Sequence, residues 1–89
     1  MQKGYNADLM VRGERYHVQT EDWGIQNPFI VSRVFINGAV LSTFKKNYAQ
    51  LIHLPPTQLN LQIQLELKKQ HEKVVDALFD GKLSSLVIV

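Results

Sequence analysis

Apolar and polar side chains alternate along residues 5–22, on both sides of Gly13-Glu14. Successive side chains of a strand point to opposite faces of a sheet, so this alternation predicts two strands with one apolar face and one polar face. Glycine at the first central position of a two-residue loop favours a type II′ turn. That turn gives three cross-strand pairs on the apolar face: Val11 with Tyr16, Leu9 with Val18 and Ala7 with Thr20.

Residues 29–45 predict a second hairpin around Asn37-Gly38, the dipeptide most typical of a type I′ turn. The predicted pairs are Ile36 with Ala39, Phe35 with Val40, Val34 with Leu41 and Val31 with Phe44. Both faces are apolar: one carries Phe29, Val31, Phe35, Val40 and Phe44, and the other carries Ile30, Val34, Ile36, Ala39 and Leu41. Since one helix covers only one face of a sheet, the second face needs the C-terminal segment or another subunit as its cover.

The segment 59–67 is ambiguous, because apolar and polar residues alternate in it as they do in a strand. Its Leu, Gln and Glu content is typical of a helix, however, and Ile63 is its only β-branched residue. We predict a helix over 57–79, with Thr57 as the N-cap and Gly81 as the stop. One helical stripe carries Leu59, Ile63, Leu67, Val74 and Leu78, and a second stripe on the flank carries Leu61 and Leu65.

The expected fold class is α+β, a four-stranded antiparallel meander followed by a long amphipathic C-terminal helix. We expect a single domain, with the sheet over 5–45, a helical half over 46–81 and an apolar tail over 82–89. The tail would add a fifth strand or pack under the helix. The helix measures roughly 35 Å and a seven-residue strand about 23 Å, so the helix should overhang the sheet or meet another helix.

The composition restricts the compartment and the chemistry. The formal net charge is only +2 and the basic residues are scattered, unlike those of a nucleic-acid-binding face. Cysteine is absent, and neither an apolar signal run nor a stretch of about 20 apolar residues occurs. We therefore expect a soluble cytoplasmic protein. No catalytic, metal or nucleotide motif is present, so we expect no cofactor and no enzymatic activity.

The polar face of the first hairpin is the candidate polar patch. His17, Gln19 and Glu21 form a row at a spacing of two, and the predicted register sets Asp8 across from Gln19. A histidine beside carboxylates can share a proton or bind a metal. A closed metal site needs further ligands, so a metal- or acid/base-using enzyme is the third hypothesis for this chain.

Three segments carry a resemblance: residues 4–8 (GYNAD), residues 16–22 (YHVQTED), and Gln70-His71 before Ala77-Leu78. Together they resemble a group of short bacterial proteins of unknown function that share the YHVQTED hairpin and a later helix. The resemblance covers most of the chain, and the hairpin motif is its specific part. It implies no activity, but it draws attention to His17, Gln19 and Glu21.

The leading functional hypothesis is a homo-oligomeric protein-interaction or adaptor module, whose partner is itself or another protein. It rests on the two-faced second hairpin and the long helix, which carry more apolar surface than a small monomer covers. The candidate interface residues are Trp23, Phe29, Val31, Phe35, Val40, Phe44, Leu61 and Leu65. The alternative is a nucleic-acid-binding sheet that uses Tyr5, Arg12, Arg15, His17 and Trp23.

Overall fold

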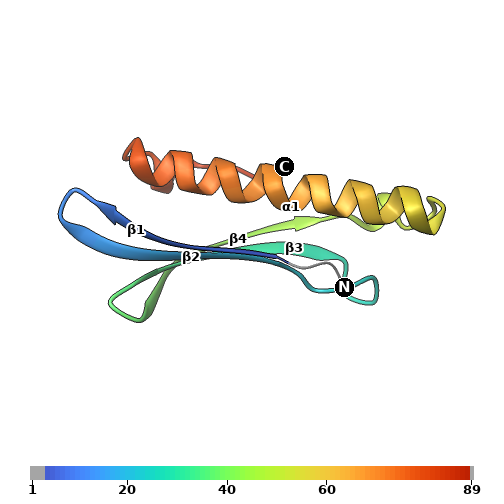
Figure 1. Ribbon diagram of the computed structural model, residues 1–89, viewed down its shortest axis with the longest axis horizontal. Helices are drawn as coiled ribbons and strands as arrows, with labels where there is room; N and C mark the ends of the chain where they lie inside the picture. The colour runs from blue at the N-terminus through green and yellow to red at the C-terminus, as the bar shows by residue number, and fades with distance from the viewer. Residues whose placement is uncertain (1–3, 89) are drawn as a thin grey trace.

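The computed structural model describes residues 4–88 as a four-stranded antiparallel sheet with one long helix across one of its faces (Figure 1). The strands lie in chain order: β1 (Tyr5–Val11), β2 (Glu14–Asp22), β3 (Phe29–Ile36) and β4 (Ala39–Asn47). A 3-10 turn, η1 (Ala49–Leu51), leads into helix α1 (Pro56–Phe79). The predicted α+β meander with a C-terminal helix is therefore confirmed.

The first hairpin turns one residue earlier than predicted. Arg12 and Gly13 have φ values of 49° and 81°, as in a type I′ turn, whereas a type II′ turn at Gly13-Glu14 was expected. Leu9 therefore pairs with Tyr16 and Ala7 with Val18, whereas the predicted partners of Leu9 and Ala7 lie two residues further along β2. Because side chains alternate with period two, this displacement leaves every side chain on its predicted face.

The tertiary structure explains why Arg12 accepts a left-handed conformation. Its guanidinium donates hydrogen bonds to the carbonyl oxygens of Leu78 (2.9 Å) and Phe79 (3.0 Å) at the end of α1. The last carbonyls of a helix lack i→i+4 partners, and a cation beside them also suits the helix dipole. The Arg12–α1 contact therefore holds the turn in place.

The second hairpin has the predicted turn and an irregularity that the sequence did not indicate. Asn37 and Gly38 have φ values of 51° and 79°, so the type I′ turn is confirmed. A β-bulge at Val34/Phe35 then shifts the register by one residue, which makes the predicted pairs Val34–Leu41 and Val31–Phe44 wrong. Phe44 lies opposite Ser32 and packs against the core under α1, not on the face that carries Val31.

Helix α1 runs from Pro56, one residue before its predicted start, to the predicted last residue. Thr57 is not its N-cap: Pro55 occupies the cap position without a side-chain hydrogen bond, and Pro56 is the first helical residue. Proline suits that position because its φ is helical and its missing N–H would have no partner there. At the other end Gly81, with φ 69°, permits Lys82 to donate to the carbonyl of Ala77 at 2.8 Å, as predicted of a glycine stop.

The core between helix and sheet has two apolar clusters. One contains Val11, Val18, Val34, Val74 and Leu78. The other lies nearer the start of the helix and contains Ile30, Tyr48, Leu59, Ile63 and Leu67. The predicted helical stripe, Leu59 to Leu78, is thus the buried face of α1.

The helix overhangs the sheet as expected from its length. Its first turns lie over η1 and the β4–α1 connection, where Leu51 and Leu54 pack against the second cluster (Figure 1). After α1 the chain forms a second 3-10 turn, η2 (Leu83–Ser85), and runs back beside the helix. Leu83 and Leu86 pack on the first cluster, and residues 83–88 add no strand to the sheet. Val89, the end of the predicted tail, lies outside the described residues.

Candidate functional sites

The candidate polar patch lies on the face of the sheet opposite α1, but its internal pairing differs from the prediction. Asp8 faces His17, not Gln19, because of the displaced turn. The Nδ1 of His17 lies 2.9 Å from the Oδ1 of Asp8. Together with Gln19, Arg15 and Phe35 they line a hollow of about 370 Å³. Glu21 lies apart and pairs with Arg33 at 3.5 Å.

The polar patch contains a histidine next to a carboxylate, but among the residues that the structure describes it contains no nucleophilic side chain beside them. A carboxylate that accepts from Nδ1 leaves the Nε2 of His17 available for a hydrogen bond to another group. The side chain of Asp8 is 80% exposed, so water screens the pair. No serine, threonine or cysteine is among the residues that line this hollow. Within residues 4–88, no three His, Asp or Glu side chains lie close enough together to hold a metal ion.

The outer face of the second hairpin, predicted to need a cover, is partly covered by Trp23, which follows β2, and by Lys45 of β4. Trp23 meets Phe29 edge-on at 6.4 Å between ring centroids, and the ammonium group of Lys45 lies 4.8 Å from the Trp23 ring. Val31 beside them is fully buried. Of the candidate interface residues on this face, only Val40 is more than half exposed. Cation–π contacts and the long Lys45 stem thus cover part of this face within one chain.

A buried polar layer separates the two apolar clusters. The hydroxyls of Thr20 and Ser32 lie 2.8 Å apart, and the Nδ1 of His71 lies 2.8 Å from Thr20. The amide nitrogen of Gln70 donates to Ser32 at 3.1 Å. One consistent proton assignment runs from Gln70 to Ser32, to Thr20 and to Nδ1 of a neutral His71. Burial lowers the pKa of His71, while the charge of Glu72 opposes this in part.

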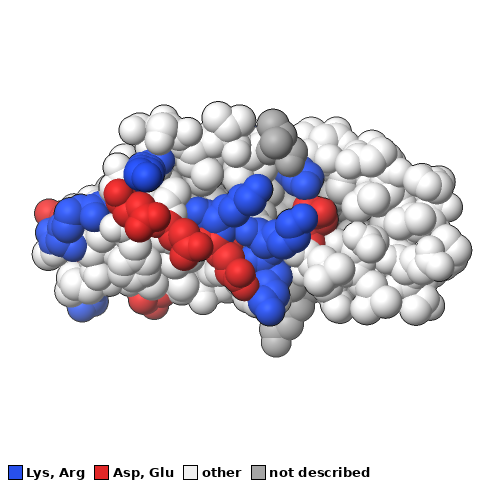
Figure 2. All heavy atoms as spheres, turned by 90° about the horizontal axis from the view of Figure 1, so that it is seen from above, with Lys and Arg blue, Asp and Glu red and all other residues white. Residues whose placement is uncertain are grey.

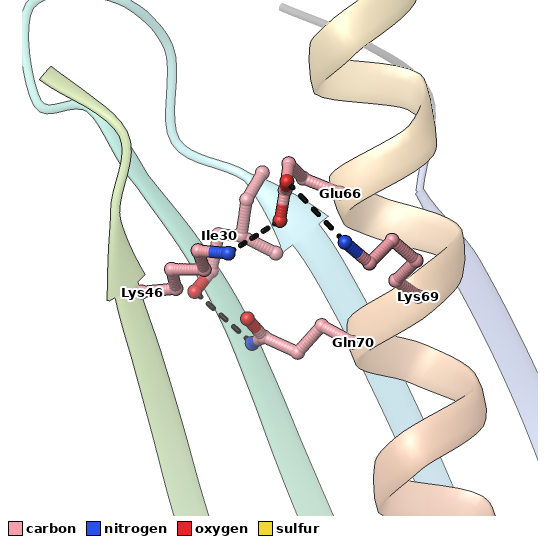
Figure 3. Close-up of polar contacts among 5 residues, drawn as sticks. All are labelled: Ile30, Lys46, Glu66, Lys69 and Gln70. Carbon is pink, nitrogen blue, oxygen red and sulfur yellow. Dashed lines mark hydrogen bonds and ion pairs between the residues drawn. The ribbon is translucent and has the colours of Figure 1, made fainter. Parts of the chain in front are cut away.

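Gln70 also links the helix to the sheet backbone (Figure 3). Its amide nitrogen donates to the carbonyls of Ile30 at 3.2 Å and Phe44 at 3.3 Å. Its Oε1 is buried and has no hydrogen-bond partner among residues 4–88. Beside it, Lys46 donates to Glu66 at 2.6 Å above a cavity of about 10 Å³ that Gln70 also lines. That volume is close to the least that accommodates one water molecule, which would satisfy Oε1.

Within residues 4–88, one end of the molecule is built from two segments without charged residues. The uncharged end is formed by residues 24–28 and 48–65, which contain no Asp, Glu, Lys or Arg. Figure 2 shows it as the continuous white region beyond the charged middle of the helix. Four of its apolar side chains are exposed: Ile25, Ile52, Leu61 and Leu65.

A cleft of about 400 Å³ opens at the uncharged end, between the start of α1, η1 and the β2–β3 loop. Its walls are mainly aliphatic, with Ile25 and Ile52 at the rim and Leu59 and Ile63 from the helix. Asp22 also lines it, and the carboxylate accepts hydrogen bonds from the Tyr48 hydroxyl and the Gly24 N–H.

The sequence predicted part of this end. Leu61 and Leu65 were expected as a flanking stripe, and they lie on the helix surface turned away from the sheet. Ile25, Ile52 and the buried Asp22–Tyr48 pair were missed. The signal available was the absence of charge over residues 47–65, which is unusual for an exposed segment.

Comparison with protein-family models, with curated proteins and with solved structures finds no match to this chain. Over residues 4–88, α1 is the only long helix, and it is not apolar enough to cross a membrane.

Proposed function

We propose that this protein is a homo-oligomeric interaction module that binds a second copy of itself through the uncharged end. The single observation that carries the proposal is the group of exposed apolar side chains, Ile25, Ile52, Leu61 and Leu65, on a surface without charges. Exposed apolar side chains of this kind are typical of an interaction site.

The absence of charge favours a second copy as the partner. Burying an unpaired charge in an interface costs several kcal/mol, so an uncharged surface selects a partner surface that is also uncharged. This chain supplies such a surface, and a twofold dimer brings identical surfaces together. The ion pairs of the middle region, such as Lys46–Glu66, would stay outside the contact.

The shape of the end also supports the proposal. The cleft beside Ile52 has room for aliphatic side chains of the second copy, while Leu61 and Leu65 project from the helix surface turned away from the sheet. An interface that combines a pocket with projecting apolar residues provides the buried centre on which affinity depends. The nucleic-acid alternative has less support, because Arg12 is bound to α1 and Arg33 pairs with Glu21.

Sedimentation velocity at micromolar concentration tests the proposal. We expect the wild-type protein to sediment as an oligomer and the double variant Leu61→Glu/Leu65→Glu to have a lower mass, which is one half if the wild type is a dimer or a tetramer. Both leucines are more than half exposed, so the change leaves the core intact. Val87→Glu is the matched control, since Val87 is exposed but lies on the tail, and it should leave the mass unchanged. A wild-type monomer, or an unchanged mass in the double variant, would contradict the proposal.

A further inference from the structure

The two edges of the sheet are protected to different degrees. The β4 edge carries a β-bulge and the adjacent lysines Lys45 and Lys46, features that discourage pairing with another strand. Strand β1, at the other edge, has no proline, no lysine and no bulge, and its one charged residue is Asp8. Edge strands of this kind are templates for another strand.

We propose that β1 pairs antiparallel with β1 of a second copy, so that two sheets join into one. The inference adds a second self-contact to the module of the proposed function, on a surface that lies apart from the uncharged end. With both contacts formed, the protein assembles as tetramers or longer even-numbered species rather than as dimers.

The backbone of β1 is oriented for such pairing. Val11 and Glu14 close the two-residue turn, so Val11, Leu9, Ala7 and Tyr5 direct their N–H and C=O groups toward β2. The intervening residues Asn6, Asp8 and Met10 direct theirs out of the sheet edge. A second strand therefore forms its backbone hydrogen bonds with these even-numbered positions. The allowed registers of the two β1 strands consequently differ from one another by steps of two residues.

Charge selects among these registers. Pairing over the full strand would set Asp8 opposite Asp8 of the second copy, and like charges directly opposite are destabilising. Slipping by two residues centres the pair on Ala7 and sets Asn6 opposite Asp8 of the other copy, twice in each dimer. The same register sets Tyr5 opposite Leu9 on the face that carries α1. It thus pairs an amide with a carboxylate on one face and two apolar side chains on the other.

The side chains along this edge are left partly uncovered within residues 4–88. Ala7 and Leu9 are half-buried, and Tyr5 is exposed while its ring stacks on His71 at 5.4 Å between centroids. On the opposite flank the returning tail supplies cover, with Leu83 and Leu86 against the first cluster. A second β1 gives the open flank the equivalent cover.

The test is made in the Leu61→Glu/Leu65→Glu variant, in which the contact at the uncharged end is removed and only the β1 contact is left. In this background Asn6 and Asp8 are changed singly and then exchanged with one another. The Leu61→Glu/Leu65→Glu variant itself should still be a dimer. Adding Asn6→Asp sets carboxylate against carboxylate and should raise the dissociation constant at least tenfold. Asp8→Asn alone is the control and should leave the dimer intact. The combination Asn6→Asp/Asp8→Asn restores an amide opposite each carboxylate and should return the dissociation constant to within about threefold of its starting value.

The outcomes separate the two contacts. If Leu61→Glu/Leu65→Glu converts an oligomeric wild type into a monomer, the β1 pairing is wrong and the contact at the uncharged end stands. If that variant is a dimer that Asn6→Asp does not weaken, the β1 pairing is also wrong. If the wild type is a dimer that Asn6→Asp alone makes monomeric, the β1 pairing stands and the contact at the uncharged end is wrong. Circular dichroism of each variant checks that the fold is retained.

Discussion

The hydroxyl of Tyr48 donates a 2.5 Å hydrogen bond to the carboxylate of Asp22, and both side chains are buried. The same carboxylate oxygen accepts from the N–H of Gly24 at 2.8 Å. The pair joins the end of β2 to the residue that follows β4, and it lies beside the cleft of the uncharged end. Burial, the hydrogen bond and the charge of Asp22 all raise the pKa of Tyr48, so its hydroxyl stays protonated as the donor.

Removing this hydroxyl should destabilise the protein. Tyr48→Phe keeps the ring in the core but takes a donor from a buried carboxylate, which we expect to cost about 1.5–3 kcal/mol. The free energy of unfolding in urea measures the loss. Tyr5→Phe is the control, because the Tyr5 hydroxyl belongs to an exposed side chain, and its change should stay within about 0.5 kcal/mol. Equal stability of the two variants would show that the Asp22 contact contributes little.

The contact of Arg12 with the end of α1 makes a second prediction. Arg12→Ala removes the hydrogen bonds to Leu78 and Phe79 but keeps a side chain at positive φ, and should cost about 1–2 kcal/mol. Arg12→Gly loses the same bonds but relieves the left-handed strain, so it should recover about 1 kcal/mol of that loss. Urea unfolding compares the two variants. An alanine variant as stable as the glycine variant would mean that the backbone at Arg12 is not strained.

The polar layer predicts how stability depends on pH. Burial lowers the pKa of His71 below its ordinary value of 6.5, so between these two values the unfolded chain binds more protons than the folded one. The contribution of neutral His71 to the free energy of unfolding is therefore complete above about pH 6.5. It is lost as the pH falls from there toward the lowered pKa of His71. A protonated Nδ1 would also have to donate to Thr20, so Thr20 could no longer donate to His71 and the hydroxyl protons of Thr20 and Ser32 would have to rearrange.

Thermal unfolding between pH 5 and pH 8 measures this effect. We expect the melting temperature to fall below pH 6.5 in the wild type, and to fall less in His71→Gln, which does not titrate. His53→Gln is the matched control because His53 is exposed, and it should retain the wild-type dependence on pH. An equal fall in His71→Gln and wild type would assign the dependence to other groups.

Local patterns determined much of this fold from the sequence alone. Asn37-Gly38 predicts its own turn because both residues tolerate positive φ, and the period of the apolar residues distinguishes the buried stripe of α1 from its exposed face. The faces of the first hairpin were also correct. They survive the displaced turn because a shift of two residues does not change which way a side chain points.

The tertiary structure decided what depends on residues far apart in the chain. Arg12 adopts the turn conformation because the end of α1, more than sixty residues later, offers carbonyls to its side chain. The bulge in β4 turns Phe44 toward the core, and the ammonium group of Lys45 lies over the rings of Trp23 and Phe29. The sequence by itself determined the four strands, the long helix, the two faces of the first hairpin and the uncharged segment. Three side-chain contacts followed only from the tertiary structure: Asp8 with His17, Asp22 with Tyr48, and Thr20 with His71. Each joins residues on different elements, and the local conformational preferences of those residues do not determine how far apart the elements lie.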